Sequence, residues 1–249
     1  GRAWKPGDYY YCWWNFGDLP DLNFDLSRDN KAEIPIRDVK DAQPNVALLQ
    51  YLLDATEYWL KDADVDGVRL DVPNEVPFWF WQLFNQRVKK VKPDAYIVGE
   101  LWGNASDYVR PGMYDAVMNY AFFRDPVLKF VCNGQGSASE FDAALATGRL
   151  TYPRQSVAVQ MNLIDSHDTV RYLTQAGGDV NRLMLAALFQ MTYVGAPAIY
   201  YGDEVALEGQ RDPDCRRPFP WDWEKDKTRS AVHAWYTSVA NLRLQHAAL

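Results

Sequence analysis

The sequence predicts an α/β protein whose strands lie parallel in one sheet. Short apolar segments typical of strands alternate with segments of helical periodicity, and parallel strands need such helical crossovers. The chain has 249 residues, of which 48% are hydrophobic and 24% charged, a composition typical of a folded protein with a large core. The alternation fits either an open doubly wound sheet or part of a (β/α)8 barrel.

The individual elements follow from apolar spacing and from the residues that end each segment. After an irregular, aromatic start, Leu48, Leu52, Ala55 and Trp59 fall on one helical stripe, which predicts an amphipathic helix. Glycine is expected to end the third helical segment, at Gly148. The predicted strands are 65–71, 95–101, 114–120, 156–168 and 196–204, and the predicted helices are 45–62, 78–93, 139–148, 180–194 and 230–245.

Composition and charge exclude several classes of protein. A net charge of −7 argues against a nucleic-acid partner, which usually requires a basic surface. The three cysteines stand far apart in the sequence and are expected to be free thiols. No apolar run is long enough to span a membrane, and no signal-peptide pattern is visible, so the compartment stays open. The ten tryptophans fit either a large core or a groove that stacks on sugar rings.

Charged side chains cluster where predicted strands end. Alternation along "GVRLDV" puts Arg69 and Asp71 on one face, with Asp71 at the carboxyl end of the strand. Glu100 ends the next strand in the same way, and Asp165, His167 and Asp168 end a later one.

Carboxylates at several strand ends favour an active site. One acid after a strand is usually a helix cap or a loop residue. Catalytic groups of (β/α)8 enzymes, however, gather at the carboxyl ends of several strands. Acids after three strands, one with an arginine and one with a histidine beside it, therefore favour a site.

Paired carboxyl groups of this kind suit the cleavage of a glycosidic bond. One carboxyl protonates the leaving oxygen, and the other attacks or activates water. Arg69 on the face of Asp71 should favour the anion that a nucleophile needs. Glu100 lies between Val98 and Trp102, and this apolar setting is expected to raise its pKa toward that of a general acid. The residues alone do not make this assignment unique.

Several of these segments resemble signatures of the α-amylase family of glycoside hydrolases, glycoside hydrolase family 13. "DGVRLDVPNEV", "IVGELWG" and "NLIDSHDTVR" resemble three of its short signature regions, in the same order and spacing. "LPDLNF" is similar to its signature in the loop after the third barrel strand, and "APAIYYGDEVALEGQRDPDCRRPFPWD" to its last strand and following loop. "SHD" in place of "NHD" is most like the neopullulanase, cyclomaltodextrinase and maltogenic amylase group.

The resemblance implies a retaining mechanism and a role for each matched residue. Asp71 would be the nucleophile, Glu100 the general acid and base, and Asp168 the stabiliser of the transition state. The implied substrate is an α-glucan, cyclodextrin or pullulan, with α-1,4 and also α-1,6 bonds as targets. The residues matched to substrate binding are Arg69, His167, Trp102, Asn74, Asp212 and Arg216, although for the last two a plain loop salt bridge is nearly as good an interpretation.

The family's first signature and first three strands are absent from this sequence. The chain is therefore expected to be a fragment that covers about the last five strands of a barrel. Residues 1–43 would be the end of the loop domain after the third strand, and residues 44–249 the carboxyl-terminal part of the barrel. No cofactor is needed for the chemistry; structural calcium is frequent in the family, but its usual ligands fall largely in the absent region. The related group often dimerises through an amino-terminal domain outside this chain, which implies a homodimer formed there.

Three alternatives stay open at this point. A transglycosylase or α-glucosidase of the same family would carry the same acids. A non-catalytic, carbohydrate-binding relative would have lost at least one acid, whereas all three are present here. A flavodoxin-like open sheet would need a phosphate-binding glycine loop, and no GxGxxG occurs in the sequence.

Overall fold

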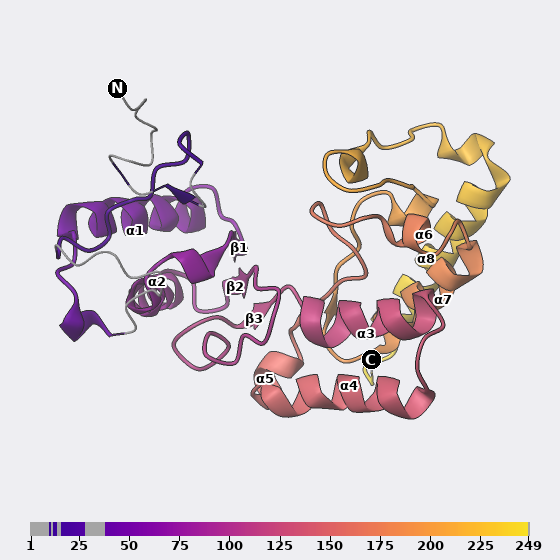
Figure 1. The fold of residues 1–249 in the computed structure, drawn as a ribbon, viewed down its shortest axis with the longest axis horizontal. Coiled ribbons are helices and arrows are strands. Elements are labelled where there is room, and N and C mark those ends of the chain that lie inside the picture. The colour runs from indigo at the N-terminus through magenta and orange to yellow at the C-terminus, as the bar shows by residue number, and fades with distance from the viewer. Residues whose placement is uncertain (1–9, 11, 14–15, 28–37, 249) are drawn as a thin grey trace, which may run out of the picture. The chain divides into compact units, whose positions relative to one another are not determined.

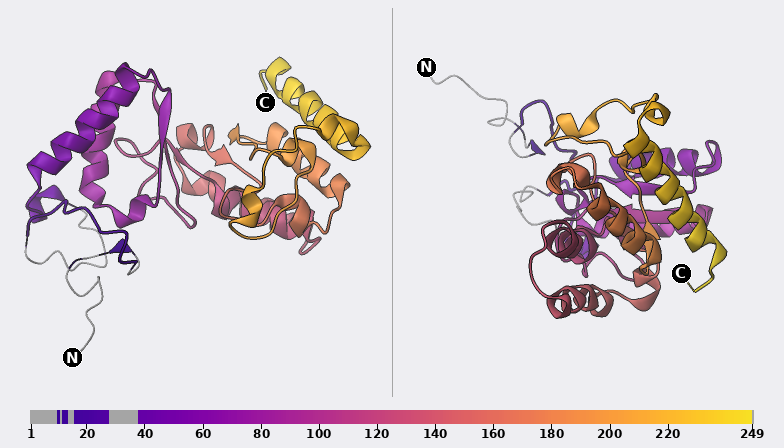
Figure 2. Two further views of the ribbon diagram at one scale, coloured as in Figure 1. Left: turned by 90° about the horizontal axis from the view of Figure 1, so that it is seen from above. Right: turned by 90° about the vertical axis from the view of Figure 1, so that its right-hand side faces the viewer.

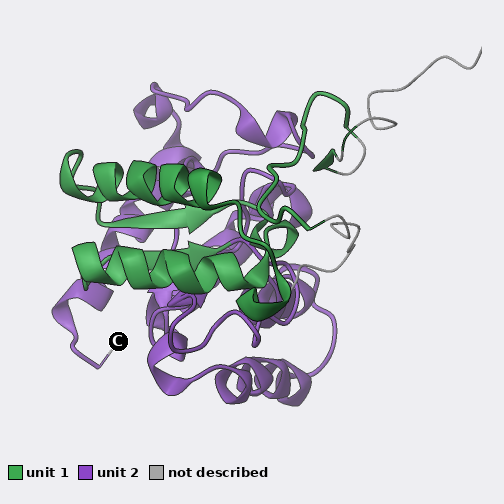
Figure 3. Cartoon of the chain, turned by 90° about the vertical axis from the view of Figure 1, so that its left-hand side faces the viewer, with its two compact units in different colours: residues 1–99 green, residues 100–249 purple. Residues whose placement is uncertain are grey.

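The computed structural model describes residues 10, 12–13, 16–27 and 38–248. The chain divides into two compact units, residues 1–99 and residues 100–249 (Figure 3). The predicted boundary between residues 43 and 44 stays a prediction.

Within its described residues, the first unit contains two parallel strands and two α-helices (Figure 1). Helix α1 (Val46–Lys61) leads into strand β1 (Gly67–Leu70), and α2 (Phe78–Val91) leads into β2 (Tyr96–Gly99). The two strands are parallel, with Leu70 opposite Gly99. All four elements were predicted from the sequence and are confirmed.

The face that α1 buries differs from the predicted one. Its buried residues are Leu49, Leu53 and Leu60, whereas Trp59 of the predicted stripe is 57% exposed. The helix carries two adjacent apolar stripes, and the stripe of leucines is the one that packs. Helix α2 buries Phe80, Phe84 and Val88 (also Phe78, Trp79 and Trp81), and α1 packs against α2.

The second unit contains short strands joined by helices. Strand β4 (Met161–Asn162) pairs in parallel with β5 (Ala196–Pro197), and β3 (Ala116–Val117) is followed by a parallel bridge between Met118 and Met161. The helices are α3 (Asp125–Val127), α4 (Ala138–Thr151), α5 (Arg154–Val157), α6 (Tyr172–Gln175), α7 (Val180–Thr192) and α8 (Lys227–Gln245). Helix α8 packs along α7 (Figure 2).

Several sequence predictions for this unit were wrong in detail. The predicted strands 114–120 and 196–204 are reduced to Ala116–Val117 and Ala196–Pro197. The predicted strand 156–168 begins as helix α5, because Pro153 starts a helical turn, and it is extended only at β4. Residues Tyr120–Cys132 are helical, with π-helical turns before and after α3, and this stretch was missed. Helix α4 continues past Gly148 to Thr151.

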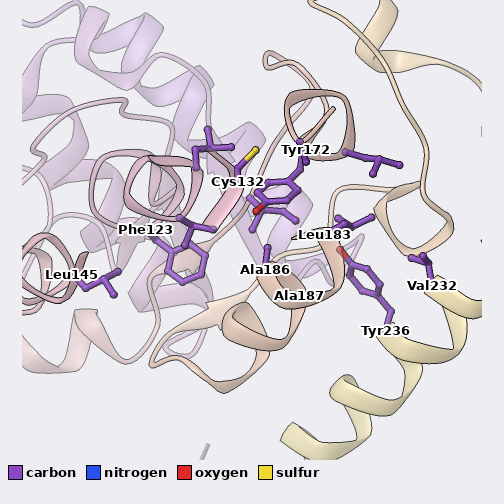
Figure 4. Packing of buried hydrophobic residues seen from close by; sticks show 14 residues of the cluster. Phe123, Cys132, Leu145, Tyr172, Leu183, Ala186, Ala187, Val232 and Tyr236 are labelled. Carbon is purple, nitrogen blue, oxygen red and sulfur yellow. The ribbon is translucent and has the colours of Figure 1, made fainter. Parts of the chain in front are cut away.

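The core of the second unit lies between its helices (Figure 4). Phe123 and Tyr172 are fully buried there together with Leu183 and Ala186 of α7. Val232 and Tyr236 of α8 close the cluster from another side. Within the described residues, no helix is long and apolar enough to cross a membrane, and the three cysteines are free, as predicted.

We predict that Gly148→Ala destabilises the protein, although alanine normally stabilises a helix interior by about 0.8–1.0 kcal/mol relative to glycine. A Cβ atom at Gly148 would lie 2.5 Å from the Cβ atom of Phe122. Such overpacking typically costs about 1–3 kcal/mol, which urea unfolding would measure. Thr147→Ala, at the exposed neighbouring position, is the control and should change the free energy of unfolding by less than about 0.5 kcal/mol. A Gly148→Ala protein as stable as the original would contradict the close approach.

Candidate active site

Glu100, His167 and Asp168 come together in the second unit. Glu100 directly follows the end of β2, and His167 and Asp168 lie in the turn after β4. The His167 Nε2 atom is 3.0 Å from Asp168 Oδ2 and 4.0 Å from Glu100 Oε1. Glu100 is buried, whereas the side chains of His167 and Asp168 are each about one-third exposed. Two acids therefore flank one imidazole at the edge of the unit.

Asp168 is held from two sides by cationic or titratable groups. One carboxylate oxygen faces His167, and the other accepts a hydrogen bond from Arg216 Nη2 at 2.9 Å. Arg216 Nε is also 2.9 Å from Asp212 Oδ1. Asp212 and Arg216 thus form the loop salt bridge that was one of the two interpretations, and Arg216 also contacts Asp168.

The main chain at His167 fixes the same arrangement. Its carbonyl oxygen accepts a hydrogen bond from Arg216 Nε at 2.9 Å and contacts the Cys215 thiol at 3.0 Å. The segment that carries Arg216 is therefore tied to the turn that carries His167 and Asp168 through both backbone and side chains.

Tyr120 and Ser166 belong to this site, although the sequence analysis did not single them out. The Tyr120 ring is buried and stacks on Trp102, with ring centroids 4.0 Å apart. Its hydroxyl donates to Ser166 Oγ at 2.9 Å. Burial above all, and then the charges of Glu100 and Asp168, raise the pKa of Tyr120 to about 12, although the hydrogen bond to Ser166 lowers it. The signal that could have found Tyr120 is its place just after the third strand.

Trp102 is about half exposed, so the ring face opposite Tyr120 is open to solvent. A flat ring backed by a second ring is rigid, and this is the surface that stacks well on the apolar face of a sugar.

The remaining predicted residues lie in the first unit. Arg69 donates a hydrogen bond to Asp71, as the strand alternation predicted, and the Asp71 side chain is 75% exposed. Val72 follows with a φ of 39°, in the left-handed region that a β-branched residue rarely adopts. Strained backbone of this kind concentrates at functional sites. Asn74 is exposed in the short 3-10 turn Pro73–Glu75.

The structure therefore groups six predicted residues in the second unit and three in the first. The roles of all nine, and the separation of the Asp71 and Glu100 carboxyl groups, stay predictions. The nine are Glu100, Trp102, His167, Asp168, Asp212 and Arg216, then Arg69, Asp71 and Asn74.

Glu100, His167 and Asp168 also have the spacing of metal ligands, since one ligand atom from each lies within 4.8 Å of the others. Calcium prefers a shell of oxygen atoms, however, and the imidazole nitrogen does not suit it. Structural calcium stays a prediction of the family resemblance.

Comparison with known proteins identifies relatives along most of the chain. A family model described as the catalytic domain of α-amylase matches residues 36–248. A cyclomaltodextrinase from a Bacillus species is 48% identical over 200 residues, which are 80% of this chain and 35% of the relative. Neopullulanase 2 from Thermoactinomyces vulgaris is 45% identical over 205 residues, which are 82% of this chain and 34% of the relative. The chain thus spans about a third of the length of these relatives.

Solved structures agree with the sequence relatives. A cyclomaltodextrinase structure matches with a TM-score of 0.77 at 42% identity, over 89% of this chain and 42% of that one. The debranching enzyme of Nostoc punctiforme matches with a TM-score of 0.82 at 33% identity, over 95% of this chain and 47% of that one. These enzymes are (β/α)8 barrels, so the predicted fold class is confirmed, with this chain matching part of such a barrel.

We predict that Cys215 is inert toward thiol reagents in the folded protein. Burial raises the pKa of its thiol, which lowers the fraction of reactive thiolate, and the side chain is fully buried against His167. Labelling with Ellman's reagent or iodoacetamide at pH 8, followed by peptide mass spectrometry, should modify the partly exposed Cys12 first. In urea both cysteines should react. Rapid native labelling of Cys215 would show that the Arg216 segment does not pack on the His167 turn.

Proposed function

Because the chain belongs to the α-amylase family of glycoside hydrolases, we propose that the protein containing it hydrolyses α-1,4 glucosidic bonds, and also α-1,6 bonds, with retention of configuration. The proposed substrates are cyclodextrins, pullulan and starch-derived oligosaccharides. Relatives named cyclomaltodextrinase and neopullulanase support this choice. Since the chain spans about a third of their length, the activity is proposed for the complete protein.

The observation that carries the proposal is the grouping of Glu100, His167 and Asp168. Glu100 is buried and borders the imidazole, so it is positioned as the group that exchanges a proton with the glycosidic oxygen. Asp168 faces His167 and Arg216, which hold its carboxylate in a fixed orientation. A fixed carboxylate can stabilise the positive charge that develops on the sugar ring in the transition state.

The proposed reaction proceeds in two displacements. Asp71, paired with Arg69, attacks the anomeric carbon while Glu100 gives its proton to the departing oxygen. This step leaves a glycosyl ester on Asp71. Glu100 then removes a proton from water, whose oxygen replaces the carboxylate of Asp71 and releases the sugar. Both groups return to their starting protonation states.

Aromatic and polar residues around these acids suit the binding of glucose units. The open face of Trp102 supports stacking of a sugar ring on the side of Glu100. Arg216, Asp212 and His167 offer polar groups that can hydrogen-bond to sugar hydroxyls on the side of Asp168. Asn74 is proposed as a further hydrogen-bonding residue because it is exposed in the turn that follows Asp71.

Glu100→Gln should lower the turnover of β-cyclodextrin by at least about 10²–10⁴-fold in the complete protein, because glutamine cannot transfer a proton. Reducing-sugar release measures the rate, and circular dichroism checks the fold. The matched control is Glu224→Gln, which changes an exposed glutamate of the same unit and should leave turnover unchanged. Undiminished turnover in Glu100→Gln would refute its proposed role.

The new reducing end formed when maltotriose is cleaved should be the α-anomer. Two displacements at the anomeric carbon invert the configuration twice and so retain it. Proton NMR recorded in the first minutes, before mutarotation, distinguishes the anomers. Initial release of the β-anomer would contradict Asp71 as nucleophile, and product analysis of the same reaction separates hydrolysis from transfer to a second sugar.

A further inference from the structure

A second group of charges lies inside the same unit, among residues that the proposed mechanism does not use. Arg171, Asp165 and Asp203 are each at most 2% exposed. Asp165 and Arg171 stand three residues before and three residues after Asp168, and Asp203 lies in the short turn Asp203–Val205 after β5. Fully buried charged side chains are rare unless they are paired, because removing a charge from water is costly.

Arg171 joins segments that are distant in the sequence. Its Nη1 atom donates to Asp203 Oδ1 at 3.3 Å, and its Nε atom donates to the carbonyl oxygen of Cys215 at 2.8 Å. Nη1 also donates to the carbonyl of Tyr201, and the guanidinium lies over the Tyr200 ring at 3.9 Å. The Arg171 main-chain N–H donates to the carbonyl of Gly209 at 2.9 Å, so residues 201–215 are bound to Arg171 at several points.

Asp165 and Asp203 are the two buried acids next to Arg171. Asp165 Oδ2 accepts a hydrogen bond from the main-chain N–H of Tyr172 at 2.6 Å, whereas Asp165 Oδ1 and Asp203 Oδ2 are buried and accept no hydrogen bond within the described residues. One guanidinium cannot neutralise two buried carboxylates, so we expect one of the two to carry a proton. Burial raises the pKa of both groups, and the charge of Asp165 raises that of Asp203 further.

The other charged groups nearby do not change the balance of charge between Arg171 and the two acids. Arg124 pairs with Asp125 at 2.8 Å, and Glu204 accepts a hydrogen bond from the main chain of Gly202. Tyr236 on α8 stays neutral, because burial and then the charges of Asp203 and Asp165 raise its pKa well above the usual value. One proton on the pair therefore leaves one negative charge opposite the positive charge of Arg171, and the buried group is neutral as a whole.

Both ends of the Asp168–Arg216 ion pair depend on this group for their position. Asp168 lies on the chain between Asp165 and Arg171, and Arg216 directly follows Cys215, whose carbonyl accepts from Arg171. Building on the proposed function, we propose that Arg171 is a positioning residue that holds His167 and Asp168 against Arg216, and that Asp165 and Asp203 hold one proton between them to balance its charge.

Lysine cannot replace Arg171 in this role. The planar guanidinium donates through Nε in one direction and through Nη1 in another, whereas an ammonium group is a point charge on a flexible chain. Asparagine, in contrast, can replace the protonated partner of the carboxyl pair. Its amide N–H₂ can donate to Asp165 and its oxygen can accept from Arg171, so Asp203→Asn is the conservative variant.

The positioning role is tested by kinetics and by NMR of the histidines. At 25 °C, Arg171→Lys should lower kcat of the complete protein on β-cyclodextrin by about 10- to 100-fold, because small misplacements of catalytic groups are costly. Asp203→Asn should stay within about 3-fold of the original, a change of less than one kcal/mol in the barrier. The imidazole resonances of His167 should move in Arg171→Lys, while those of His233 and His246, the other histidines of the chain, should not. Unchanged kcat and unchanged His167 resonances in a folded but less stable variant would reduce Arg171 to a structural residue.

The shared proton is tested by urea unfolding at several pH values. A carboxyl group with a raised pKa in the folded state stabilises the protein below its unfolded pKa of about 3.9, and this stabilisation is lost as the pH rises through the folded value. The urea midpoint of the original protein should therefore fall between pH 4 and 7 relative to that of Asp203→Asn. Asp165→Asn/Asp203→Asn, which leaves Arg171 without a counter-ion, should unfold at lower urea than either single variant. Parallel pH curves for the original protein and Asp203→Asn would overturn the shared proton.

The two proposals can fail separately. The histidine resonances and the pH curves need no substrate, so they test the buried group even if the protein acts on another sugar. If the original protein did not hydrolyse cyclodextrin, only the proposed function would be contradicted.

Discussion

The parallel register of β1 and β2 is the constraint on which the candidate site depends. Leu70 lies opposite Gly99 in this register. Since parallel strands end at the same edge of a sheet, the next residue of each strand, Asp71 and Glu100, leaves the sheet at its carboxyl edge. A shift of one residue in either strand would turn its acid to the opposite face. The placement of the two carboxyl groups therefore depends on the backbone pairing of β1 and β2.

In the second unit the site residues lie on irregular segments. Such segments need more side-chain contacts to hold them in place than strands do. Its strands β4 and β5 are only two residues long each. The turn after β4 and the loop after β5 are therefore held by side chains: Arg216 on Asp168 and on the carbonyl of His167, and Arg171 beneath them on the carbonyl of Cys215. Polar contacts in this unit replace what a longer ladder of backbone hydrogen bonds would supply.

Most of the fold was predictable because its signals are local. The pairs α1–β1 and α2–β2 were predicted from periodicity, and the acids at strand ends from their position. Features that depend on neighbours distant in sequence were not predictable. Pro126, a residue that usually interrupts a helix, lies at the start of α3 within a helical stretch. Gly148 lies inside α4, at a position where Phe122 leaves no room for a side chain.

The candidate site likewise has residues that were predictable from local sequence and residues that were not. Arg69 beside Asp71 follows from strand alternation, and His167 and Asp168 are adjacent in sequence. Tyr120, stacked on Trp102, was missed because only tertiary structure brings the two rings together. Arg171 and Asp203 look like loop charges in the sequence, and their complete burial appears only when residues 201–215 close over the turn after β4. The roles of the acids came from the family resemblance.

The distance between the carboxyl groups of Asp71 and Glu100 tests the central claim most directly. A crystal structure of the complete protein with a bound maltooligosaccharide would measure it at the sugar that is cleaved. Two displacements through a glycosyl ester require a separation of about 5–5.5 Å. A separation of about 6.5–9.5 Å would leave room for a water molecule between acid and base, as in inverting enzymes. That result, or two carboxyl groups that do not face a common glucose unit, would contradict the account.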